Sequence, residues 1–122
     1  MPTSSFTQLD VWKKAHQVTL EIYRITERFP HHQRFGLTSQ MQRAAVSIPA
    51  NIAEGYGRRR AMDKARFYTI AAGSSEELKY YLILSKDLKY TMDIELLWQT
   101  LEDVSRMLRR LTEATVSIPQ SH

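Results

Sequence analysis

The chain has 122 residues, of which 43% are apolar, and its 17 basic and 13 acidic side chains give a net charge of +4. This length has room for one domain, and the absence of cysteine excludes disulfides, iron–sulfur sites and thiol catalysis. No apolar run reaches the roughly 20 residues that a membrane helix needs, and the first residues lack the layout of a signal peptide, so we expect a cytoplasmic protein.

Two helices are expected in the first half of the chain. In residues 9–29 apolar side chains recur at spacings of three and four, which keeps them on one helical face, and Pro30 should end this helix. The second helix is expected over residues 38–54. Its start at Thr38 would place a hydroxyl where it can cap free backbone N–H groups, and Gly55 is its expected stop.

The second half predicts two more helices, over residues 62–89 and 93–115. Asp93 is the expected N-cap of the last helix, which carries a regular apolar heptad. No alternation of period two is long enough to predict a strand. Four helices joined by short loops bury their apolar faces most simply in an all-α, antiparallel up-down-up-down bundle, a single domain over residues 1–122 with frayed ends.

Pro49 lies inside the expected second helix and should kink it, because proline removes the hydrogen bond to the carbonyl of Ala45 and crowds it. Ser47 and Asn51 are short polar residues that could satisfy the freed backbone groups. Asn51 and Glu54 are three residues apart and share a face. We expect them to be buried between helices, where they would specify the fold.

Small residues on two helices predict a close crossing. Ala50 and Ala53 on the second helix would face Gly73, Ser74 and Ser75 on the third. This arrangement lets two backbones approach with the polar side chains enclosed between them.

Some apolar residues fall outside the helical stripes. Residues 80–84 are apolar around the whole circumference of the third helix, and Trp98 lies beside the apolar seam of the fourth. A partner chain that covers Tyr80, Leu82, Ile83 and Trp98 is the favoured explanation, which predicts a homo-oligomer; a crowded core in a monomer is the alternative.

The sequence gives little support to catalysis or to a metal centre. No Glu-x-x-His pair of the kind that di-iron bundles use is present, and there is no nucleophile motif or phosphate-binding loop. Glu54, Glu76 and Glu77 could meet between the second and third helices as an acid–base pair, but each has a basic side chain within ion-pairing reach. We expect no catalytic residue, no metal and no cofactor.

The most concentrated charge follows the second helix. Residues 56–66 have a local net charge of +4, equal to that of the whole chain. Such a cluster attracts polyanions, although a solvated surface is the plain alternative. Without an aromatic side chain in the patch beyond Tyr56, phosphate contacts with little base specificity are expected. The candidate nucleic-acid ligands are Arg58, Arg59, Arg60, Lys64 and Arg66.

Three strings identify a family resemblance. QMQRAAVSIPANIAEGYGR, FYTIAAGSSEELKYYL and LDVWKKAHQVTLEIYRI resemble the four-helix bundle proteins of the 23S rRNA intervening-sequence family, over roughly residues 8–115. Similar bundles include the accessory variability protein of diversity-generating retroelements.

The resemblance implies a homopentamer and makes binding of nucleic acid, or of a reverse transcriptase, an expectation. Ser47, Pro49, Asn51, Glu54 and Gly55 match the family signature as structural residues. Three functions remain open at this point: a non-enzymatic oligomeric bundle that binds RNA or DNA, a protein-interaction scaffold for an acidic or nucleic-acid-bearing partner, and a hydrolase that uses Glu54 and Glu77. The third function requires both carboxylates to be open to solvent.

Overall fold

The computed structural model describes residues 5–117, and in this range the chain forms four α-helices, two short 3-10 helices and no strand. The four-helix, all-α prediction is confirmed, with helix boundaries within three residues of those expected; the frayed ends lie outside the described residues. The elements are η1 (Phe6–Gln8), α1 (Asp10–Thr26), η2 (His31–Gln33), α2 (Leu37–Tyr56), α3 (Ala61–Asp87) and α4 (Glu95–Ser117).

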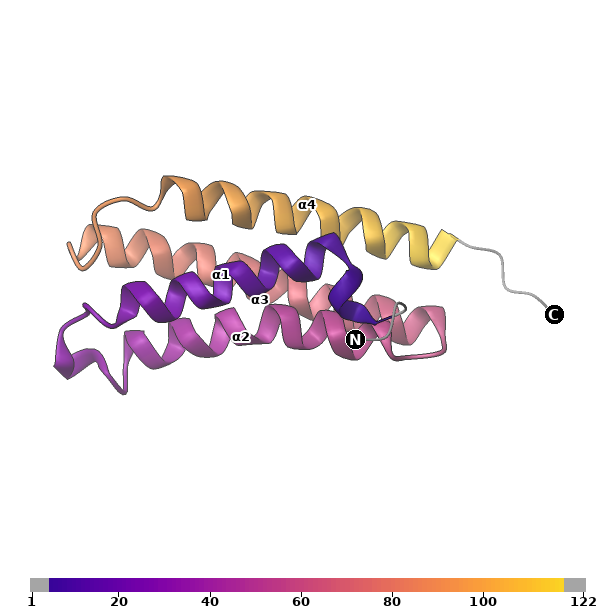
Figure 1. Cartoon of the computed structure of the whole chain (residues 1–122), viewed down its shortest axis with the longest axis horizontal. Coiled ribbons are helices and arrows are strands. Elements are labelled where there is room, and N and C mark those ends of the chain that lie inside the picture. The colour runs from indigo at the N-terminus through magenta and orange to yellow at the C-terminus, as the bar shows by residue number, and fades with distance from the viewer. Residues whose placement is uncertain (1–4, 118–122) are drawn as a thin grey trace.

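The helices lie side by side along one axis, and the ribbon reverses its direction at each connection (Figure 1). Each helix packs against the next along the chain, and α4 also packs against α1. The diagonal pairs, α1 with α3 and α2 with α4, make no close backbone contact among the described residues. The bundle therefore has two ends, and the α2–α3 turn, the start of α1 and the last turns of α4 share one of them (Figure 1).

The core consists of the apolar stripes on which the helix prediction was based. Each fully buried Leu or Ile contributes roughly 1.5–3 kcal/mol relative to exposure. Leu82 belongs to this core, so its expected place at an oligomer interface was wrong: it lies four residues after Leu78 and continues the inward face of α3. The largest fully buried side chains are Ile22, Met41, Ile48, Ile52, Leu78, Leu82, Leu101 and Leu108.

Side chains cap the starts of two helices. α2 begins at Leu37, whose N–H donates to Gln33 Oε1 at 3.1 Å. Thr38 is therefore inside the first turn and is not the cap that we expected. At the start of α4, Asp93 Oδ1 accepts a hydrogen bond from the N–H of Glu95 at 3.0 Å, so the capping side chain was identified correctly.

Pro49 lies in the middle of α2, which continues as an α-helix from Leu37 to Tyr56. The carbonyl of Ala45, which Pro49 leaves without its partner in the helix, lies 3.0 Å from Thr19 Oγ1 on α1. The Thr19 hydroxyl also lies 3.0 Å from the carbonyl of Ala15, so its one proton is shared between two acceptors; the donor offered to Ala45 comes from a neighbouring helix, where the sequence had suggested local side chains. The kink itself stays a prediction.

Ser47, Asn51 and Ser74 form a polar cluster between α2 and α3. Asn51 Nδ2 donates to the carbonyl and to the hydroxyl of Ser47, at 2.8 and 2.9 Å, and Ser47 Oγ lies 2.7 Å from Ser74 Oγ. Glu54 is not buried with them: its side chain is 54% exposed and forms an ion pair with Arg58 one turn later. The expectation that Asn51 and Glu54 are enclosed together was wrong for Glu54.

Two glycines have roles other than those expected. Gly55 does not end α2, which continues to Tyr56; it is buried, and a Cβ there would lie 2.7 Å from Tyr68 Cε1 and 3.1 Å from Phe67 Cβ. Its missing side chain lets α3 approach α2. Gly73, expected at the close crossing, is exposed and has nothing within 4 Å of a Cβ position, so it is not there. Ala50 is also exposed and takes no part in a crossing.

Candidate nucleic-acid interface

Two arginines near the α2–α3 turn are held against one aromatic ring. The guanidinium carbon of Arg58 lies 4.7 Å, and that of Arg66 4.6 Å, from the centroid of the Phe67 ring. Arg58 also donates to Glu54 Oε2 at 3.2 Å. Cation–π contacts restrict the rotamers of both arginines while their N–H groups stay in water. The pair is therefore ordered before any anion binds.

Lys64 has a structural contact of its own. Its Nζ donates to the carbonyl of Tyr56 at 2.8 Å and lies 3.4 Å from the carbonyl of Gly55, which are terminal carbonyls of α2. Such carbonyls have no partner within their helix, and a cation there also offsets the negative end of the helix dipole. Lys64 therefore stabilises the end of α2, and its contact with nucleic acid stays a prediction.

Arg59 and Arg60 are the exposed charges of the turn. Both side chains are open to solvent, and neither forms a hydrogen bond or ion pair with any residue between 5 and 117. Arg60 occupies the N-cap position of α3, where its side chain makes no capping hydrogen bond. Their charge is thus not neutralised within the described part of the chain.

The fold adds two further arginines to this end. Leu111 and Thr115, in the last turns of α4, line the same cavity as Arg59 and Lys64. Arg109 and Arg110 occupy the preceding turn and are exposed; Arg110 lines a neighbouring cavity with Leu9 and Leu111, whereas Arg109 lies farther along α3, beside Thr69 and Glu113. Nothing in the local sequence relates these arginines to residues some fifty positions earlier. We call the seven residues Arg58, Arg59, Arg60, Lys64, Arg66, Arg109 and Arg110 the basic end.

A cavity of about 310 Å³ opens at the basic end. Tyr68 is the most buried of its lining side chains, only 2% exposed, and its hydroxyl forms no hydrogen bond with another described residue. Burial, with a smaller contribution from nearby Tyr56, raises the pKa of Tyr68 above its ordinary value, so the phenol stays a neutral donor. The lining consists of Leu9, Tyr56, Arg59, Ala61, Lys64, Tyr68, Leu111 and Thr115.

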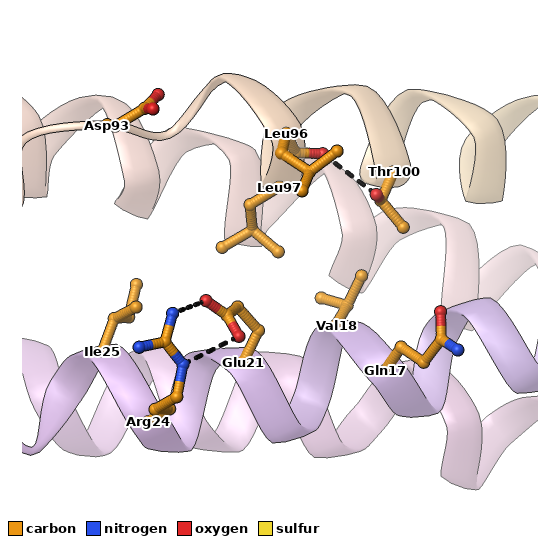
Figure 2. Close-up of a pocket in the computed structure, with 9 residues that line it drawn as sticks. All are labelled: Gln17, Val18, Glu21, Arg24, Ile25, Asp93, Leu96, Leu97 and Thr100. Atoms are coloured by element: carbon orange, nitrogen blue, oxygen red, sulfur yellow. Dashed lines mark hydrogen bonds and ion pairs between the residues drawn. The ribbon is translucent and has the colours of Figure 1, made fainter.

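A larger cleft lies elsewhere, between α1 and α4, and encloses about 600 Å³ (Figure 2). Several of its polar groups have partners: Arg24 bonds Glu21, and Thr100 Oγ1 donates to the carbonyl of Leu96. The hydrogen bond from Arg24 holds the pKa of Glu21 below its usual range. No histidine is among the described residues of its lining. This cleft offers paired charges and apolar surface, with no candidate nucleophile–base pair.

The three carboxylates considered for acid–base chemistry are separated. Glu77 forms an ion pair with Arg43, which precedes Glu54 by eleven residues of α2, or about 16 Å along the helix axis. Glu76 pairs with Lys79 on another face. Glu54 and Glu77 are both partly exposed, yet they are too far apart to act on one substrate atom. Within residues 5–117 no three histidine, aspartate or glutamate side chains are grouped as a metal site would require.

The expected oligomer residues divide into two groups. Tyr80 is 57% exposed and Ile83 is also exposed, both on the outer side of α3. Trp98 is half-buried, with Lys79 Nζ 5.6 Å from its ring centroid, so part of its surface is covered within the chain. Tyr80 and Ile83 remain available to a partner chain.

Comparisons with known proteins agree with this fold. The family profile described as 23S rRNA-intervening sequence protein matches residues 7–110. A similar solved structure is the 1.70 Å crystal structure of a protein with unknown function from the S23 ribosomal protein family of Bacteroides thetaiotaomicron VPI-5482; the TM-score is 0.78 at 22% identity, over 84% of this chain and 98% of that one. At this identity the likeness shows the fold alone. No curated protein matches the chain, and no described helix has the length and apolarity to cross a bilayer.

Proposed function

Given that the chain belongs to the 23S rRNA-intervening sequence protein family, we propose that it is a non-enzymatic helical bundle that binds RNA or DNA through its basic end. The observation that carries the proposal is the exposure of Arg59 and Arg60 with no acidic partner among the described residues. Exposed, unpaired guanidinium groups can form bidentate hydrogen bonds with phosphate oxygens without first breaking an ion pair.

The neighbouring arginines support the same function. Arg58 and Arg66 are already ordered on Phe67, and Arg109 and Arg110 extend the positive surface onto α4. Contacts of this kind fix the position of a strand and release counterions, and they carry no direct sequence information. The expected activity is thus salt-sensitive binding with weak sequence preference.

Fluorescence anisotropy with labelled RNA and DNA at low ionic strength tests this function. Arg59→Ala/Arg60→Ala should weaken binding roughly tenfold or more, since each replacement removes a charge-assisted hydrogen bond. Arg34→Ala/Lys86→Ala is the matched control: it removes two exposed charges at the opposite end and should bind like wild type. A wild-type protein that binds neither RNA nor DNA, or a control that loses as much affinity, would refute the proposal.

We further propose that the protein is a homo-oligomer, a pentamer by the family resemblance, in which Tyr80 and Ile83 contact a second copy. Their exposure on the outer side of α3 supports this. A ring would repeat the basic end around its axis, so that one strand could contact several copies and gain avidity.

A protein partner is the second candidate function. The α1–α4 cleft exposes Leu96 to 77%, an apolar surface that suits a protein better than a phosphate backbone. Copurification before and after nuclease treatment, followed by mass spectrometry, separates the two functions. A partner such as a reverse transcriptase that stays bound after digestion favours the scaffold, whereas loss of all bound material favours nucleic acid.

A further inference from the structure

We propose that the cavity beside Tyr68 receives one unpaired nucleobase of a bound strand, so that the protein prefers single-stranded to double-stranded nucleic acid. This inference deepens the proposed function and rests on it. It goes beyond the expectation, drawn from the sequence, of phosphate contacts with little base specificity.

The unpartnered hydroxyl of Tyr68 is the first observation that points to a ligand. The side chain is almost fully enclosed and lines the cavity, yet the hydroxyl has no hydrogen bond to another described residue. No buried side-chain nitrogen or oxygen of the described residues lacks a partner, so this hydroxyl is the part of Tyr68 that reaches solvent, through the cavity. Its raised pKa keeps it protonated at neutral pH, so it can donate to a ring nitrogen or to an exocyclic oxygen of a base.

The shape and lining of the cavity suit a flat, partly apolar group. Leu9, Ala61 and Leu111 supply apolar surface, and Tyr56 supplies an aromatic ring, over which Lys64 Nζ lies 5.5 Å from the centroid. The volume of about 310 Å³ lies at the lower limit of small-molecule pockets, which are about 300–1,000 Å³. Proteins that read single strands stack unpaired bases on aromatic rings and bond their edges in such pockets.

Positive charge surrounds the cavity where the phosphates of that nucleotide would lie. Arg59 lines the cavity itself, and Lys64, although its Nζ bonds the end of α2, adds charge to the wall. The first turn of α3 begins here with no side-chain cap, so its free N–H groups add positive potential. Asp63 in the same turn opposes this field with one negative charge. The two basic side chains in the wall of the cavity, Arg59 and Lys64, outnumber this single acidic one.

Base pairing would keep a nucleobase out of the cavity, which is why the inference predicts a preference for single strands. The test uses three probes: a single-stranded RNA of about 12 nucleotides, the same strand with abasic sites, and its duplex. Anisotropy should show wild type binding the intact single strand more tightly than the other two. Tyr68→Phe keeps the ring and removes the hydroxyl; it should weaken binding of the intact strand roughly fivefold, the effect of one hydrogen bond, and leave the abasic strand unchanged.

A second variant and a stability measurement guard against a purely structural effect. Ala61→Leu narrows the cavity without altering charge and should also abolish the difference between intact and abasic strands. Tyr68→Phe should unfold at about the same temperature as wild type, because the hydroxyl forms no hydrogen bond with another described residue. Lower stability together with an equal loss for all three probes would assign Tyr68 a structural role and overturn the inference.

The failure of this inference and that of the proposed function give different results. If wild type binds none of the probes, the proposed function itself is wrong. If it binds intact, abasic and duplex probes equally and in an arginine-dependent way, the basic end binds phosphate and the cavity takes no base.

Discussion

Gly55→Ala perturbs the closest approach between α2 and α3. The added Cβ would lie 2.7 and 3.0 Å from two ring carbons of Tyr68 and 3.1 Å from Phe67 Cβ. The Tyr68 ring is buried, and Phe67 is held between two arginines, so neither can move away without disturbing its own contacts.

The expected magnitude combines two opposing effects. Replacing glycine by alanine within a helix gains roughly 1 kcal/mol, and forcing a methyl group into an occupied space costs about 1–3 kcal/mol. We expect the overcrowding to dominate and the free energy of unfolding to fall by about 1 kcal/mol. Gly73→Ala is the matched control, because it adds a methyl group to the next helix in open space and should gain roughly 1 kcal/mol.

Urea denaturation of the two variants, followed by circular dichroism, measures both changes. The variants should differ by about 2 kcal/mol, which corresponds to several degrees in melting temperature for a chain of this length. If Gly55→Ala proved as stable as Gly73→Ala, the inference that Gly55 is required for close helix packing would be refuted.

Three other predictions concern a buried hydroxyl, a buried amine and the outer surface of α3. Thr19→Val should lower the free energy of unfolding by about 1–3 kcal/mol, because it leaves the Ala45 carbonyl unpaired. Pro49→Ala restores an N–H for that carbonyl, so Thr19→Val should cost less in a protein that also carries Pro49→Ala. Additive effects of the two changes in a urea double-mutant cycle would contradict the role of Thr19. Burial lowers the pKa of Lys79, but hydrogen bonds to its two glutamate partners outweigh burial and raise the pKa above its ordinary value. The stability from this charge is complete below about pH 10.4, the ordinary lysine value, and is lost as the pH rises through the higher folded-state pKa. Melting temperatures across this range should therefore fall more for wild type than for Lys79→Met. Parallel curves for the two proteins would show that the Lys79 charge does not stabilise the fold. Tyr80→Glu should reduce the mass measured by light scattering towards that of one chain, 14.2 kDa, whereas a wild type that is already monomeric would exclude the oligomer.

Local sequence patterns were sufficient to predict the four helices, because apolar periodicity and N-cap residues act within a few positions of one another. The same local signals were ambiguous for particular residues. A glycine near a helix end is typical of a stop, yet Gly55 is needed for packing against Tyr68 on another helix. Leu82 lies in a run that is apolar on all sides, and only the register of α3 shows that it faces inward.

Features that depend on contacts between distant segments could not be predicted. The donor for the Ala45 carbonyl is Thr19, which lies 26 positions earlier on another helix. Arg110 lies near Arg59 only because α4 ends beside the α2–α3 turn, where Leu111 lines a cavity with each of them. The basic cluster was visible as a charge run; its extension onto α4 and the cavity beside it require the arrangement of the helices.

The salt dependence of nucleic-acid binding tests the central claim most directly. For single strands, each phosphate contact contributes about 0.7 to the slope of log K against log salt. Removal of two contacts in Arg59→Ala/Arg60→Ala should therefore reduce the slope by about 1.4, while Arg34→Ala/Lys86→Ala leaves it at the wild-type value. Equal slopes for wild type and both variants would show that phosphate is not bound at the basic end.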